Sequence, residues 1–279
     1  DHPVQMLADR AVIAGMTFLL MYLYRLAPCK FSAFIRIVIQ MSLLSYCIPD
    51  TFEFNRIFPN LDHVFASVEQ WIFGGQPAVM VLSAFSADVG DEPFNMGYFF
   101  YYPMILLVVV WYFLYRFDLF EKVSFVIVTA FFIYYLIYIF VPVAGPQFYF
   151  PAIGGDNVAQ GIFPLSAIIQ HNQELLPGPG YEHGFFYNLV ESSQQVGERD
   201  GGIPQFACRM STILMIMAWR GSRRLFACLL PFYLLLCGAT VYIQAHYLID
   251  AIVGFFSAIV LYVVATWMFK RWFAQPMFK

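Results

Sequence analysis

Long runs of apolar residues constrain this chain more than any other feature of its sequence. Those at 123–143, 225–242 and 247–269 are each long enough for an α-helix to cross the ~30 Å hydrocarbon core of a bilayer. They are continuous and lack the alternation of lumen-facing and lipid-facing residues typical of a β-barrel strand. Only 12% of the residues are charged, against about 25% in an average soluble domain. The sequence therefore predicts an all-α, polytopic transmembrane helical bundle.

Seven apolar runs are expected to span the membrane, as six core helices plus one extra N-terminal span. In chain order they are Ala11–Ala27, Phe34–Ile48, Gly97–Tyr115, Val123–Val143, Phe206–Trp219, Leu225–Tyr242 and Tyr247–Phe269. Because the sequence starts at Asp1 rather than Met, an upstream segment is expected. The predicted regions are an N-terminal transmembrane hairpin (1–50), an interfacial or re-entrant segment (51–96), and a core (97–279) with an outer loop at 145–204.

The segment 51–96 differs from the spans because charged residues, glycine and proline interrupt it. Within it, Leu61–Phe73 has the apolar spacing of an amphipathic helix that lies in the membrane interface. The next stretch, Pro77–Phe85, is apolar but too short to cross a bilayer. We expect this region to lie at the membrane surface or to dip into it.

Basic residues fix the expected orientation. Eleven of the fifteen lie on one side of the predicted topology, which the positive-inside rule assigns to the cytoplasm. They are Arg25, Lys30, Arg36, Arg116, Lys122, Arg220, Arg223, Arg224, Lys270, Arg271 and Lys279. The outer loop then faces a periplasm or lumen, and nothing in the charge pattern indicates a nucleic-acid partner. The five cysteines are scattered and form neither a disulfide framework nor a metal-binding spacing.

The clearest candidate site is the pair His246 and Asp250, between the last two spans. A spacing of four residues on a helix places both side chains on one face, where the carboxylate can hold the imidazole in one tautomer. Such a histidine can act as a general base or as a nucleophile. Metal binding is the weakest alternative, because no further ligand lies at a suitable spacing. The bland alternative is an interfacial ion pair that only anchors the last helix, although an acidic residue inside an apolar zone is costly.

The context of this pair resembles the type-2 phosphatidic acid phosphatase superfamily. The resemblance rests on Pro204 before a span with Ser211 and Thr212 in its first turns, and on the ending T-V-Y-x-x-x-H-Y-x-x-D at 240–250. It looks closest to the inositol phosphorylceramide synthase-like branch. It implies a site at the outer or lumenal end of the bundle, where His246 attacks phosphorus, Asp250 orients it and a second histidine protonates the leaving alcohol. It also implies no cofactor, and a bacterial inner membrane with the site on the periplasmic side.

The sequence departs from the family pattern at three places. Gln205 and Ala207 occupy the positions of a serine and of the acid histidine, Thr240 replaces an arginine six residues before the nucleophile, and an early K-x(6)-R-P motif is not found. The chain is therefore a degenerate member, a member with substitute residues, or a sequence altered in this stretch. The expected substitutes are His183 or His171 for the acid, and Arg209 or Arg199 for phosphate binding.

Each of these residues also has a plainer interpretation. Loop histidines are usually solvated, and Arg199 beside Asp200 can be a surface pair. Tyr98, Tyr101 and Tyr102 could line a headgroup entrance, but tyrosines at an interface ordinarily form an anchoring belt. Gly254 is expected to allow close helix packing.

The predicted function is a membrane lipid phosphatase or phosphotransferase that acts on a lipid phosphate ester, with a phospholipid or sphingolipid as substrate. The alternative is a catalytically silent lipid-binding protein of the same fold. A secondary transporter is a third hypothesis, but no internal repeat or midplane ionisable residue supports it.

Overall fold

The computed structural model describes residues 3–44, 51, 54–55, 57–84, 92–165, 184–199 and 207–273, and every regular element in them is an α-helix. The helices are α1 (Pro3–Leu26), α2 (Lys30–Leu44), α4 (Asp62–Phe73), α5 (Pro77–Ala84), α6 (Glu92–Phe99), α7 (Tyr101–Tyr115), α8 (Phe117–Phe140), α9 (Pro146–Ile153), α10 (Gly155–Gln160), α11 (Phe185–Arg199), α12 (Ala207–Gly221), α13 (Arg223–Tyr242) and α14 (Leu248–Phe273). The prediction of an all-α, polytopic helical bundle is confirmed.

Four of the described helices, α1, α8, α13 and α14, are long and apolar enough to cross a membrane on their own. The predicted span Gly97–Tyr115 is instead a bent pair, α6 and α7, whose axes differ by 43° and which together satisfy the same criterion. Helices α2 and α12 have 15 residues each, so their described parts are shorter than the ~17 residues that a span needs.

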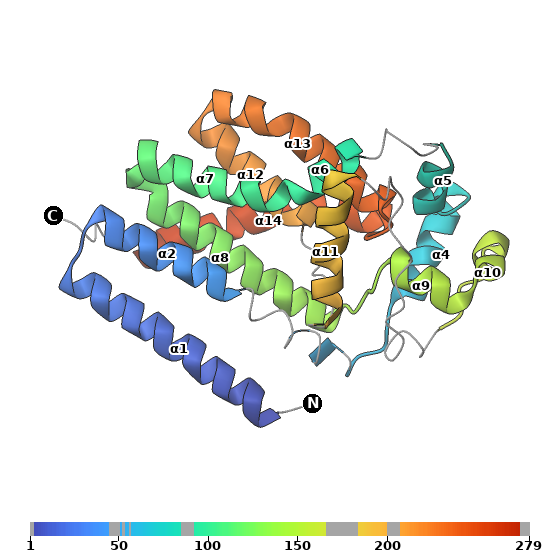
Figure 1. Ribbon diagram of the computed structural model, residues 1–279, viewed down its shortest axis with the longest axis horizontal. Helices are drawn as coiled ribbons and strands as arrows, with labels where there is room; N and C mark the ends of the chain where they lie inside the picture. The colour runs from blue at the N-terminus through green and yellow to red at the C-terminus, as the bar shows by residue number, and fades with distance from the viewer. Residues whose placement is uncertain are drawn as a thin grey trace.

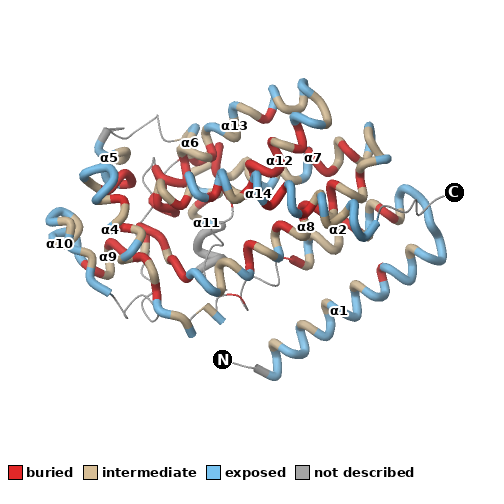
Figure 2. The backbone as a smooth tube through the Cα atoms, turned by 180° about the vertical axis from the view of Figure 1, so that it is seen from behind, coloured by how far each residue is buried: buried red, intermediate tan, exposed pale blue. Residues whose placement is uncertain are grey.

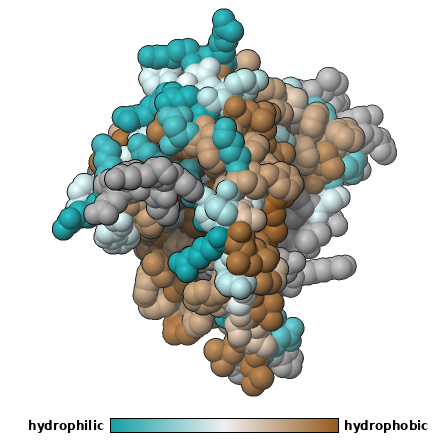
Figure 3. Space-filling view, turned by 90° about the vertical axis from the view of Figure 1, so that its left-hand side faces the viewer, coloured by the Kyte–Doolittle hydropathy of each residue, from teal (hydrophilic) through white to brown (hydrophobic). Residues whose placement is uncertain are grey.

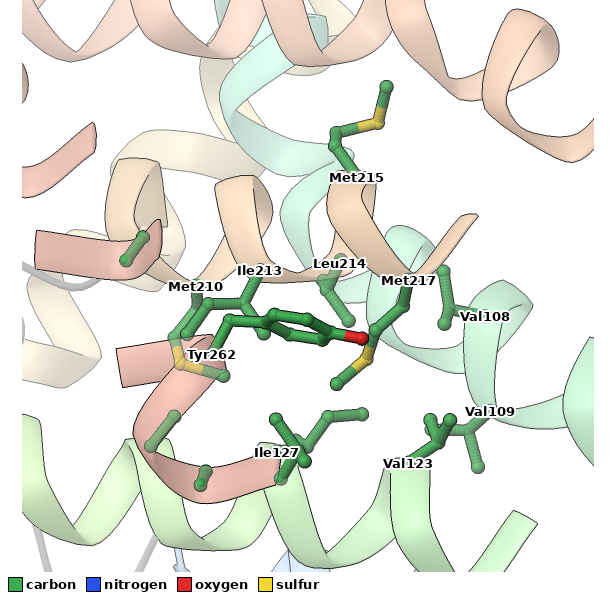
Figure 4. Packing of buried hydrophobic residues seen from close by; sticks show 14 of the residues in the cluster. Val108, Val109, Val123, Ile127, Met210, Ile213, Leu214, Met215, Met217 and Tyr262 are labelled. Atoms are coloured by element: carbon green, nitrogen blue, oxygen red, sulfur yellow. The ribbon is translucent and has the colours of Figure 1, made fainter. Parts of the chain in front are cut away.

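The long helices pack side by side around an apolar core (Figure 1). Its fully buried members come from α7, α8, α12, α13 and α14, and include Val108, Ile127, Leu214 and Met217. In Figure 4, the ring of Tyr262 lies between the side chains of α12 and those of α8, so a single aromatic residue connects three helices. This core makes the bundle a rigid support for whatever lies at its ends.

The crossing of α6 and α13 depends on Gly97. A Cβ atom at this position would lie 2.6 Å from Cβ of Leu235 and 2.8 Å from the backbone nitrogen of Leu236. The two backbones can approach this closely only because Gly97 has no side chain. The bend after α6 then lets α7 continue along the bundle.

Helix α1 lies apart from the rest of the bundle and contacts it chiefly through α2 (Figures 1 and 2). Apolar residues such as Val4, Leu7 and Phe18 are more than two-thirds exposed. From Ala11 to Tyr24 the helix has no charged residue and is covered by little protein, which fits a lipid environment and agrees with the extra N-terminal span predicted from the sequence.

The two ends of the bundle differ. The turns between α7 and α8 and between α12 and α13 lie at the end shown in Figure 3, where hydrophilic residues cover much of the upper surface. Lys122 of α8 lies near Arg220 of α12 and Lys270 of α14 at this end, so basic residues from three helices gather there. The short helices α4, α5, α9 and α10 lie at the opposite end (Figure 1), where α13 ends and α14 begins. We call this second end the outer end.

The spacing of apolar residues predicts an amphipathic helix at α4, and the face that this helix buries in the protein is the acidic one. Asp62 and Glu69 are fully buried, together with Ala66, whereas Trp71 is 84% exposed. Two carboxylates thus face the protein interior and apolar side chains face outward. The physical reason is that the interior contains backbone and hydroxyl donors that match the carboxylates, as described below.

Candidate active site

The turn that carries the site is short and fixed by backbone hydrogen bonds. Helix α13 ends at Tyr242, and Gln244 adopts a left-handed conformation (φ 61°) that is costly for a residue other than glycine. The N–H of Gln244 donates to the carbonyl of Val241 (3.1 Å), and the N–H of His246 donates to the carbonyl of Thr240 (3.0 Å). The carbonyl of Gln244 in turn accepts the N–H of Gln147 from α9 (3.0 Å). The chain reversal therefore delivers His246 to a defined position just before α14.

His246 and Asp250 are in contact, as their spacing predicts. The distance from Nδ1 of His246 to Oδ2 of Asp250 is 3.1 Å, and both residues are buried, with exposures of 3% and 4%. An ionised carboxylate can only accept a hydrogen bond, so this contact favours the tautomer with the proton on Nδ1. Nε2 then carries the lone pair. It is buried and has no hydrogen-bond partner among the described residues.

Arg209 binds the other oxygen of the Asp250 carboxylate. Its Nη2 forms an ion pair with Oδ1 of Asp250, while its guanidinium carbon lies 5.5 Å from the centre of the Tyr134 ring. Asp250 thus connects α12 to the histidine, with one oxygen for each partner. A buried carboxylate needs such compensation, and removing one member of a buried pair typically costs about 3–5 kcal/mol. The expected phosphate-binding role of Arg209 stays a prediction.

Gly254 provides the space through which the Arg209 side chain passes. A Cβ atom there would lie 2.8 Å from Cγ and 3.3 Å from Nε of Arg209. The sequence indicated that this glycine permits close packing, and the structure shows that the packed group is the arginine side chain. A methyl group at this position would displace Arg209 near its base, where the side chain has little freedom to move aside.

Two buried carboxylates on α4, which sequence reasoning did not assign to the site, hold the residues that follow His246. Oδ1 of Asp62 accepts the hydroxyl of Tyr247 (2.9 Å) and the N–H of Gly145 (2.9 Å), and Oδ2 accepts the N–H of Ala144 (2.7 Å). Burial raises the pKa of the Asp62 carboxyl, although these donors oppose the shift. The signal in the sequence was the spacing of seven residues between Asp62 and Glu69, which places both carboxylates on one face of a helix.

Glu69 caps the start of α14. The N–H of Ile249 donates to its Oε1 (2.9 Å), and the N–H of Leu248 also donates to the carboxylate, while Oε2 is buried without a partner in the described part of the chain. Burial raises the pKa of Glu69 to about 7, and the negative charge of Asp250 adds to the shift. A carboxylate at a helix N-terminus satisfies N–H groups that have no partner within the helix.

The remaining predicted residues are placed as follows. Tyr98 is buried on α6, Tyr101 is partly buried, and Tyr102 is 63% exposed with its ring 5.3 Å from that of Tyr101. His183, His171 and Gln205 lie outside the described residues, and so does the side chain of Arg199 at the end of α11. Ala207 is buried at the start of α12, and Thr240 is buried with its hydroxyl 3.3 Å from Sγ of Cys208.

Metal coordination has no support in the described residues, which contain no group of three or more histidine, cysteine, aspartate or glutamate side chains that could hold an ion. The chemistry available at the outer end is that of an oriented imidazole and a buried arginine-carboxylate pair. This set fits nucleophilic attack or proton transfer at an anionic group.

The sequence profile of the PAP2 superfamily matches residues 63–264, which is most of the chain. The chain therefore belongs to the PAP2 superfamily, whose members are phosphoesterases, and it is a multi-pass membrane protein. The matched region begins at the second residue of α4 and includes Glu69, Arg209, His246 and Asp250. No curated protein and no solved structure matches the chain.

Proposed function

We propose that the protein hydrolyses or transfers a lipid phosphate ester through a phosphohistidine intermediate on His246. This proposal rests on the hydrogen bonding of the His246 imidazole, in which one ring nitrogen is held and, among the described residues, the other is free to react. Asp250 holds Nδ1 at 3.1 Å, and Nε2 is buried and unpartnered among the described residues. Membership in a superfamily of phosphoesterases and the apolar surface of the bundle support a membrane lipid as substrate.

In the first step Nε2 of His246 attacks phosphorus, and the bond to the leaving oxygen breaks. Asp250 accepts the Nδ1 proton in a hydrogen bond and stabilises the positive charge that develops on the ring. In the second step water, or an alcohol in the inositol phosphorylceramide synthase-like branch, takes the phosphoryl group and regenerates the free imidazole.

Arg209 is proposed to contribute to phosphate binding. A guanidinium has five N–H donors, and Asp250 uses only one of its nitrogens. Its charge next to the nucleophile would stabilise the phosphoryl oxygens in the transition state. Arg199 and the substitute acid His183 belong to the same proposal, as do an entrance lined by Tyr98, Tyr101 and Tyr102 and a site on the periplasmic face of a bacterial inner membrane.

The test is phosphate release from dioctanoyl phosphatidic acid in detergent micelles. We expect His246→Ala to abolish release, with a loss of ~10³-fold or more. The matched control is His63→Ala, which removes a histidine on α4 that takes no part in the contacts of His246, Asp250 and Arg209, and which should retain activity. Unchanged turnover in His246→Ala would disprove the phosphohistidine mechanism.

A catalytically silent lipid-binding protein is the second candidate, and Ala207 is the observation that favours it. Alanine cannot protonate a leaving alcohol. We expect a silent protein to bind the same lipid without releasing phosphate, and Ala207→His to create activity. Release of phosphate by the unmodified chain would reject this candidate.

A further inference from the structure

We propose that Glu69 is a positioning residue for the His246–Asp250 pair, acting from α4 through the first turn of α14. This inference rests on the proposed function. It assigns a role to a residue 180 positions away from the helix that it caps.

The residues between His246 and Asp250 are held by contacts from α4. Between His246 and Asp250, the hydroxyl of Tyr247 donates to Asp62, and the N–H of Ile249 donates to Glu69. The N–H of Leu248 also donates to Glu69. All three residues between the two members of the site are therefore held by carboxylates from α4.

Burying the Glu69 carboxylate costs free energy. Glu69 is fully buried, and its Oε2 has no hydrogen-bond partner among the described residues. A buried carboxyl oxygen without a partner is expensive, and serine, threonine, aspartate or asparagine usually caps a helix more cheaply from the chain itself. The start of α14 has no such residue, because Tyr247 precedes it. The cap is supplied from another helix instead, which locks α14 to α4.

The start of α14 also sets the relative position of His246 and Asp250. His246 lies outside α14, before its first turn, while Asp250 lies inside it. Their 3.1 Å contact therefore depends on the orientation of the first turn of α14 relative to the residues that precede it. A rotation of the first turn would separate the two side chains, and a displacement of about 1 Å at a reacting group can cost ~10²-fold in rate.

Glu92 provides a matched control within the same chain. Its two carboxylate oxygens accept the N–H groups of Phe186 and Tyr187, both at 3.0 Å, at the start of α11. It is thus a second glutamate that caps a helix from another helix. The capped helix carries neither His246 nor Asp250, and Glu92 contacts the end of α11 opposite to Arg199.

The experiment compares Glu69→Ala, Glu69→Gln and Glu92→Ala in phosphate release from dioctanoyl phosphatidic acid, with the melting temperature of each variant measured in the same detergent. We expect Glu69→Ala to lower kcat by roughly 10- to 100-fold with little change in KM, because the nucleophile is misplaced while the lipid surface is intact. Glu69→Gln keeps an oxygen acceptor at Oε1 and should restore most of kcat. Glu92→Ala should retain kcat.

A wild-type kcat in Glu69→Ala would overturn the proposal. So would a Glu69→Gln variant as slow as Glu69→Ala, because that result would assign the effect to the carboxyl proton rather than to the cap. If Glu69→Ala fails to fold, Leu248→Pro removes one of the capping N–H groups at a position where helices tolerate proline, and it should lower kcat without changing KM. Loss of activity in His246→Ala, measured in parallel, keeps the proposed function standing even if Glu69 proves dispensable.

Discussion

The middle of the bundle and its outer end are both buried, but they are built from opposite kinds of side chain. The middle is packed with Val108, Ile127, Leu214 and similar residues, whose contacts have no preferred direction. The outer end buries Asp62, Glu69, His246 and Asp250, each held by specific donors or acceptors. Substitutions in the middle should therefore change stability, whereas substitutions at the outer end should change chemistry.

Asp250→Asn is expected to have the largest effect on activity at the outer end. The amide keeps the shape of the carboxylate but loses its charge, so it no longer favours the Nδ1 tautomer of His246 or balances Arg209. We expect kcat for phosphatidic acid to fall by ~10²-fold or more.

Its control is Ser257→Ala, on the same helix, which removes a hydroxyl that donates to the carbonyl of Gly254 (2.9 Å) and lies 3.3 Å from the hydroxyl of Tyr134. An Asp250→Asn variant with the kcat of Ser257→Ala would mean that the carboxylate only anchors α14. This result would support the alternative hypothesis from the sequence, in which the pair only anchors the last helix.

The apolar middle is tested by Ile127→Ala. This residue is fully buried on α8, and deleting its side chain leaves a cavity in the apolar core. The free energy of unfolding should fall by about 2–5 kcal/mol, measured as a lower melting temperature in detergent. Turnover per folded molecule should stay close to the wild-type value, and a loss of kcat in the folded fraction would show that the two regions are coupled.

Gly254→Ala should lower activity less than Asp250→Asn does. The added methyl group meets Arg209 at 2.8 Å, so the arginine must shift away from Asp250. We expect kcat to fall by ~10-fold. Gly15→Ala is the matched control, because a Cβ atom there meets nothing within 4 Å. Equal activities would show that the Arg209–Asp250 contact tolerates displacement.

The helices and the contact between neighbouring residues could be predicted from the sequence, whereas the contacts between distant segments could not. Apolar runs predicted the bundle, and the spacing of His246 and Asp250 predicted their contact, because both signals are local. The inward orientation of Asp62 and Glu69 could not be inferred, since their partners are backbone N–H groups and a hydroxyl more than 80 residues away. Periodicity predicted that α4 is amphipathic but did not show which face contacts the protein, and these donors turn its acidic face inward.

The smallest expected effect is a dependence of stability on pH that originates at the outer end. Burial raises the pKa of Glu69 from 4.5 to about 7, so the folded state binds a proton that the unfolded state releases between these values. The stabilisation is complete below pH 4.5 and is lost as the pH rises through 7. Between pH 6 and pH 8 the free energy of unfolding should therefore fall by about 1 kcal/mol from this group alone.

Melting curves of the wild type and Glu69→Gln, recorded in one detergent from pH 6 to pH 8, isolate this contribution. The amide cannot ionise, so the variant should lose the Glu69 part of the pH dependence and gain stability relative to the wild type as the pH rises. Asp62, whose pKa is also raised, contributes a dependence of the same sign that both proteins share. Parallel melting curves would mean that Glu69 stays ionised in the folded state, and that its Oε2 has a donor that compensates for burial.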